Sequence, residues 1–135
     1  MAGSISDYLE SKILDHMTGK TQFTFPTSRW VGLFTTAPTD AGGGVEVSGG
    51  SYARLEFNGA TGRAFTAASG GAAENSAAWE FATASADWGT IVAFGIFDAL
   101  SGGNMEWWGD ITPNKLVSSG DTARFASGAL DLSVT

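Results

Sequence analysis

The chain has 135 residues, of which 43% are hydrophobic, 12% aromatic and 16% charged. Its 19 glycines are about twice the usual share, and its charged fraction lies well below the average of about 25%. A chain of this length can bury one hydrophobic core but not two, so we expect a single domain. The composition favours short strands joined by many turns over a helical bundle or a disordered chain.

Seven basic residues and fourteen acidic residues give a formal net charge of −7 at pH 7. Such a chain repels phosphate backbones and anionic lipid surfaces, so we expect neither nucleic acid nor a membrane as its partner. The absence of cysteine excludes disulfides and thiolate metal sites. No signal peptide and no apolar run of roughly 20 residues is visible, so we expect synthesis in a cytoplasm.

The first expected element is a helix within residues 1–19. Ser4 is the expected N-cap, and Gly19 is the expected C-terminal stop. An apolar stripe recurs every four residues along this helix, at Ile5, Leu9, Ile13 and Met17. Tyr8 and His16 lie beside the stripe. The stripe packs either on the domain's own core or on a neighbouring subunit, and both interpretations stay open.

Strand-like segments follow the helix. Residues 29–35 and 52–57 have strand composition and alternation, and each is expected to form one strand. The glycine-rich segment 40–51 between them is expected to be an exposed loop with a small hairpin around Val45. Residues 60–75 are rich in Ala, Gly, Thr and Ser, which predicts irregular structure.

The second half of the chain contains more short strands. Residues 79–82 form one, and 90–97 are the most apolar run, which predicts a central strand. A hairpin turn is expected at 101–104, with 105–111 as the return strand. Further short strands are expected at 115–117, 122–126 and 129–134. Seven to eight strands predict a mainly β fold, an antiparallel sandwich or jelly roll over residues 20–135.

The sequence provides few groups for catalysis. The one histidine, His16, lies in the expected helix, and no nucleophile motif or zinc motif accompanies it. The acidic residues are scattered, without the spacing of a calcium loop or a visible pair for sugar hydrolysis. The glycine run at 42–44 lacks the Gly-Lys-Ser/Thr of a phosphate-binding loop. We therefore expect no enzyme activity, no catalytic residue, no cofactor and no metal.

Trp107 and Trp108 are adjacent, so in a strand their side chains point to opposite faces. At most one of them enters a given core, and the other lies on a second face, at an interface or in solvent. Packing in a core and at an interface is the favoured explanation, and a sugar-binding platform is the alternative. The candidate protein-interface residues are therefore Ile5, Tyr8, Leu9, Ile13, Met17, Trp107 and Trp108.

Ordered sequence blocks run along nearly the whole chain. They read LFT at 33–35, APTD at 37–40, GGSYAR at 49–54, ADWGT at 86–90, FGIFD at 94–98 and FASG at 125–128. In these blocks and in its N-terminal helix, the chain is similar to a family of small virion structural proteins of tailed bacteriophages. Members of that family carry labels that range from tail fibre to head-associated protein. The resemblance implies a structural role and supplies no catalytic residues.

Two virion roles follow from these observations. The leading hypothesis is a capsid decoration or cement protein, a homotrimer on the outer surface of the head that bridges and stabilises major capsid subunits. Small size and acidity favour this role, since an outer-surface protein need not meet DNA. The alternative is a tail-fibre or tail-tip component that contacts host glycans or a host surface protein through loop 40–51 and one tryptophan. Either protein is made in the host cytoplasm and ends in the virion.

Overall fold

The computed structural model describes residues 3–58 and 60–133, which form ten strands and one helix. In chain order the elements are β1 (Gly3–Ile5), α1 (Asp7–Met17), β2 (Arg29–Thr36), β3 (Val45–Glu46), β4 (Leu55–Phe57), β5 (Ala72–Glu74), β6 (Trp79–Glu80), β7 (Gly89–Phe97), β8 (Met105–Val117), β9 (Arg124–Phe125) and β10 (Asp131–Ser133). The predicted fold class is confirmed, since the domain is small, mainly β and antiparallel with one short N-terminal helix. The jelly-roll assignment stays a prediction.

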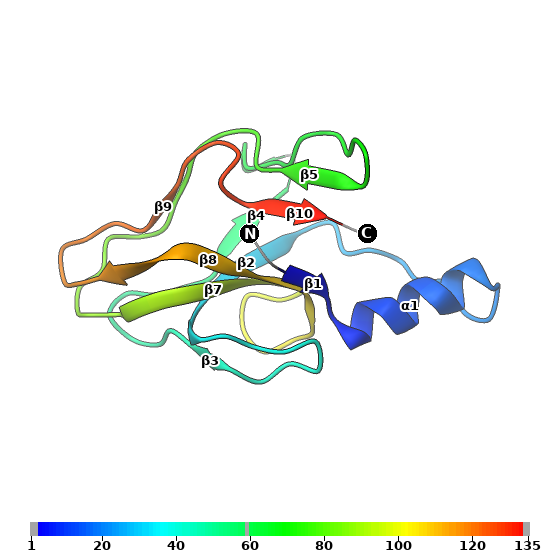
Figure 1. Cartoon of the computed structure of the whole chain (residues 1–135), viewed down its shortest axis with the longest axis horizontal. Coiled ribbons are helices and arrows are strands. Elements are labelled where there is room, and N and C mark those ends of the chain that lie inside the picture. The colour runs from blue at the N-terminus through cyan, green and yellow to red at the C-terminus, as the bar shows by residue number, and fades with distance from the viewer. Residues whose placement is uncertain (1–2, 59, 134–135) are drawn as a thin grey trace.

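A six-stranded antiparallel sheet forms the base of the molecule (Figure 1). Its order is β1-β8-β7-β2-β3. The outer edge of β2 is shared, because β3 pairs with its C-terminal half and β4 with its N-terminal half. The apolar run of β7 is central, as its composition predicts, because it pairs with β8 on one side and β2 on the other. The pairs β5–β10 and β6–β9 lie over one face of this sheet.

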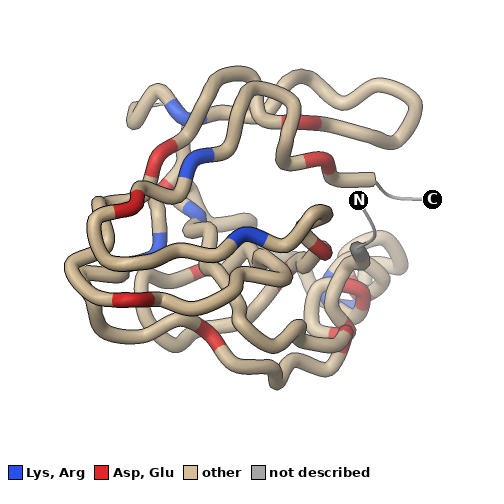
Figure 2. Tube along the Cα trace, turned by 60° about the vertical axis from the view of Figure 1, so that its left-hand side comes forward, with Lys and Arg blue, Asp and Glu red and all other residues tan. Residues whose placement is uncertain are grey.

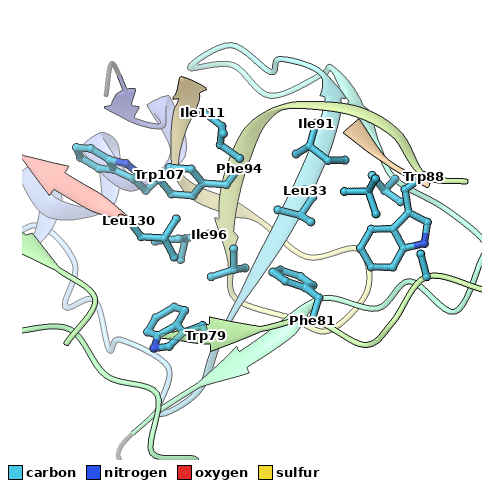
Figure 3. Close-up of a cluster of buried hydrophobic side chains, with 14 residues drawn as sticks. Leu33, Trp79, Phe81, Trp88, Ile91, Phe94, Ile96, Trp107, Ile111 and Leu130 are labelled. Atoms are coloured by element: carbon cyan, nitrogen blue, oxygen red, sulfur yellow. The ribbon is translucent and has the colours of Figure 1, made fainter. Parts of the chain in front are cut away.

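The pleat of the sheet divides its apolar residues between two clusters. The main core lies on the face that β6, β9 and β10 cover, and Figure 3 shows its large side chains. The adjacent strands β2, β7 and β8 each have a pair of consecutive large apolar residues. One residue of each pair lies in this core: Leu33, Ile96 and Trp107. The other residue of each pair lies in or against a smaller cluster on the opposite face: Phe34, Phe97 and Trp108. The two adjacent tryptophans therefore point to opposite faces, as predicted.

The N-terminus differs from the prediction. Ile5 does not belong to the helical stripe but lies in β1, opposite Trp107 in β8. The helix begins after Ser6, so Ser6 and not Ser4 is the N-cap. The Ser6 hydroxyl accepts a hydrogen bond from the Leu9 N–H at 3.2 Å. The edge strand prevails here because its backbone groups find partners on β8.

The C-terminus of α1 agrees with the prediction. Gly19 adopts a left-handed conformation with φ of +74°, which a glycine adopts without steric penalty. Its N–H donates to the His16 carbonyl at 3.2 Å, and the Lys20 N–H donates to the Asp15 carbonyl at 2.9 Å. These two bonds form a Schellman motif, which ends the helix. No helix among the described residues is long and apolar enough to cross a membrane.

Two glycine-rich segments are more ordered than expected. Segment 40–51 is not simply an exposed loop, because it contains β3 and because Val47 is buried in the main core. Within 60–75, the strand β5 pairs with β10. Each segment has few large apolar residues among its glycines and small residues, so its periodic signal is too short to predict a strand.

Two strand boundaries near the C-terminus also differ from the prediction. The strand expected at 115–117 is the end of β8, which is one strand of 13 residues. The last strand is Asp131–Ser133, and residue 134 of the predicted 129–134 lies outside the described residues.

Candidate protein interface

Helix α1 is anchored to the body of the molecule at its N-terminal end. The Ser6 N–H donates to the Glu106 carbonyl at 3.0 Å, and the Ser6 hydroxyl donates to the Met105 carbonyl at 2.5 Å. One residue later, the Asp7 N–H donates to the Asp40 carbonyl at 2.9 Å. These bonds fix the direction of the helix, whose C-terminal half projects away from the sheet (Figure 1).

The apolar stripe of α1 becomes more exposed along the helix. Leu9, near the anchored end, is 9% exposed, whereas Met17, in the last turn, is 74% exposed. Ile13 lies between them and is half-buried. Leu14, which falls outside the i, i+4 stripe, is also exposed. We call Leu14 and Met17 the helix tip. The tip presents apolar surface that the chain's own core does not cover.

The segment after α1 folds back along the helix. The Phe23 ring meets the Tyr8 ring edge to face, with centroids 6.5 Å apart. The Phe23 N–H donates to His16 Nδ1 at 3.1 Å, so the single histidine holds this connection. Phe25 follows, is half exposed, and lies under the Arg29 guanidinium at 4.9 Å from its ring centroid. One side of α1 is thus covered by its own connector, through Tyr8.

An apolar groove of about 590 Å³ lies beside α1. The helical end of the molecule contributes Ile5, Leu9, Ile13 and Phe25 to its lining. The large sheet contributes Ile96 and Trp107, and the strands and loops above it contribute Phe57, Phe65 and Leu132. We call this the α1 groove. Three candidate residues from the helical region and one of the two tryptophans therefore meet at one surface.

One ion pair lies in the α1 groove. Ile96 faces Trp107 and Phe97 faces Met105, so Glu106 is the extra residue of a β-bulge. Glu106 is 2% exposed, and its Oε1 lies 2.5 Å from Arg29 Nε. Its Oε2 has no hydrogen-bond partner in the described structure. Burial raises the pKa of this carboxyl above its ordinary value, against the opposing effect of Arg29, and the Asp98 charge raises it further.

The other candidate residues lie apart from the groove. Met17 is at the helix tip, and Tyr8 faces the connector. Trp108 lies on the opposite face of the sheet, half-buried, and its Nε1 donates to Asp40 Oδ1 at 2.8 Å. Contact of any of these residues with a partner stays a prediction. Phe25 was not among the predicted interface residues, although its place in a polar connector was a signal of a non-core role.

A more polar hollow of about 410 Å³ lies between the glycine-rich loop and the β7–β8 turn. Its polar groups are largely used within the chain. Asp40 accepts from Trp108, and Asn104 Nδ2 donates to Asp98 Oδ2 at 3.0 Å. Within residues 3–58 and 60–133, no group of three or more His, Asp or Glu side chains could hold a metal ion. The hollow is lined by part of loop 40–51, which the glycan alternative names, but by neither Trp107 nor Trp108.

Comparison with protein families identifies the class of the chain. Residues 4–133 match the family described as Podophage GP4 fiber I protein gp80. The chain belongs to this family. It is therefore a fibre-like structural protein of a phage virion, as its resemblance to small virion proteins of tailed bacteriophages implied. No match was found among curated proteins. The family description fits the tail-fibre alternative better than the capsid-decoration hypothesis.

Proposed function

We propose that the chain is a structural component of a phage tail fibre, which acts by binding protein neighbours and catalyses no reaction. The observation that carries this proposal is the family match over residues 4–133. The match covers nearly the whole chain, so it refers to the β domain and the helix together. The partners proposed are other copies of the chain, as a homotrimer, and further tail proteins.

The structure supports a role in assembly. A protein that works by assembly needs apolar surface beyond the area that its own core uses. The α1 groove and the helix tip provide such surface at one end of the molecule. A second hollow of about 560 Å³ lies farther along the sheet, lined by Leu33, Ile91 and Ile111 among others.

Capsid decoration is the second candidate, with the major capsid protein as its partner. One observation favours it: the described residues form a compact domain, and they include no extended shaft (Figure 1). The net charge of −7 also suits the outside of a head filled with DNA. A compact domain suits a fibre module equally well, so the family match decides the order of the two candidates.

The place of the chain in the virion tests both candidates. Purified virions are labelled with a gold-conjugated antibody against the chain, and its copy number is measured by quantitative mass spectrometry. The major capsid protein serves as the internal standard. A few to a few dozen copies with label at the tail support the fibre proposal. Hundreds of copies over the head support decoration, and absence from virions overturns both.

A further inference from the structure

We infer that the helix tip of one copy inserts into the α1 groove of a second copy. The inference rests on the proposed function, in which the chain binds protein neighbours, and it names the partner and the surfaces. It starts from the distribution of exposed apolar residues. Among the described residues, six large hydrophobic side chains are at least half exposed, and three of them lie on α1 or shortly after it: Leu14, Met17 and Phe25.

The tip cannot fill the groove of its own copy. Leu9 and Ile13 already line that groove from the anchored part of the helix. Met17 lies about 12 Å farther along the axis than Leu9, since each helical residue adds about 1.5 Å. The hydrogen bonds of Ser6 to β8 hold the helix in this direction. The tip and the groove of one molecule are therefore separate surfaces, and each is available to another molecule.

Charge explains why the groove suits a second copy of this acidic chain. Two copies with a net charge of −7 each repel one another over most orientations. The charged residues that line the groove are Arg29 and Glu106, and they neutralise each other at 2.5 Å. Figure 2 shows acidic residues spread over the helix, strands and loops. A neutral apolar surface is where two such chains can approach without like-charge repulsion.

The arrangement allows two symmetries. Two copies can exchange tips reciprocally about a two-fold axis, or each tip can enter the groove of the next copy in a head-to-tail contact. A head-to-tail contact closes into a ring when its rotation allows, and a ring of three matches the proposed homotrimer. The buried stripe of α1 would then continue from one subunit into the next through Met17.

Cysteine pairs test the contact in the full chain. The chain has no cysteine, so an introduced thiol has no competitor. Met17→Cys places a thiol on the tip, and Ala68→Cys places one on an exposed residue that lines the groove. Mixing the two variants under mild oxidation should give a disulfide-linked pair of one Met17→Cys chain and one Ala68→Cys chain. Leu116→Cys, 68% exposed on β8, replaces Met17→Cys in the control and should give little of this product.

Sedimentation velocity gives the second readout. The wild-type chain should sediment as an oligomer. Met17→Glu should weaken association at least tenfold, because a charge would replace the methionine that the inferred contact buries in the second copy. Leu116→Glu should associate like the wild type. A wild-type chain that stays monomeric up to about 100 µM overturns the inference, as does equal crosslinking of the Leu116→Cys control. A monomeric chain would also exclude the proposed homotrimer, whereas the role as a tail-fibre component is tested separately by the location of the chain in virions.

Discussion

The centre of the sheet and the α1 end of the molecule use the same kinds of side chain in different ways. On β2 and β7, most apolar residues are buried, on both faces of the sheet, and Trp30 and Val92 are half-buried. On α1, apolar residues change from buried to exposed within eleven residues. The first region stabilises the domain, and the second presents exposed apolar surface, which we propose as the surface for assembly. Substitutions in the two regions should therefore separate stability from association.

The largest effect should come from the centre of the sheet. Phe94 on β7 is fully buried in the main core. Phe94→Ala should lower the free energy of unfolding by about 3–5 kcal/mol, because it removes buried apolar area and leaves a cavity. Denaturant titration followed by tryptophan fluorescence measures this loss. A loss below about 1 kcal/mol would contradict the burial of this ring and would weaken the contrast with α1.

The next largest loss of stability is expected at the N-terminal end of α1, which joins the helix to the sheet. Ser6→Ala removes the N-cap hydroxyl and its second bond to the Met105 carbonyl. We expect a loss of about 1–2 kcal/mol in the free energy of unfolding. Ser4→Ala is the matched control, because the Ser4 hydroxyl bonds only to the neighbouring Ile5 carbonyl. If the two variants lost equal stability, Ser6 would not be the cap that fixes the helix.

This pair of serines shows what the sequence could and could not predict. Period-four spacing correctly predicted the helix and its end at Gly19, because those signals are local. The start was wrong because Ile5 pairs with Trp107, about one hundred residues later in the chain. Spacing alone cannot show that a distant strand competes for the first residues of a helix. A deletion of residues 1–19 would consequently be a poor test of assembly, since it would also remove β1.

The candidate interface was also predicted only in part. The spacing of Leu9, Ile13 and Met17 gives the apolar stripe, but not the point at which the helix leaves the sheet. That point depends on the backbone anchor at Ser6. The groove itself was not predictable, because Phe57, Phe65 and Leu132 come from three separate segments of the chain. The bulge at Glu106 was also invisible, since it is a property of the pairing of β7 and β8.

A pH-dependent effect should come from the ion pair in the groove. The pKa of the Glu106 carboxyl is raised above 4.5 in the folded chain. Between the ordinary and the raised pKa, the folded state binds more protons than the unfolded state. The contribution of Glu106 to stability therefore decreases as pH rises through that window. Glu106→Gln removes this dependence, so the variant should gain stability relative to the wild type as pH rises from about 4 to about 7.

Denaturant titrations of both chains across that pH range measure the difference. The sign is diagnostic, because a carboxyl stabilised mainly by Arg29 would have a lowered pKa and would give the opposite slope. If the free energies of unfolding of the wild type and Glu106→Gln changed in parallel with pH, Glu106 would be well hydrated in solution. The groove would then be open to water at its ion pair, which would count against a dry contact between subunits.

The smallest effect on stability should come from the helix tip. Met17 is 74% exposed, so Met17→Ala removes few contacts within the subunit, and alanine is a good helix former. The free energy of unfolding of the monomer should change by less than about 0.5 kcal/mol. The Met17→Ala and wild-type chains are compared in dilute solution, at concentrations where sedimentation shows monomers only. A loss above about 1 kcal/mol would mean that the tip packs inside its own subunit. The helix tip would then contribute to the stability of its own subunit, as the centre of the sheet does. It would not be free to bind a second copy.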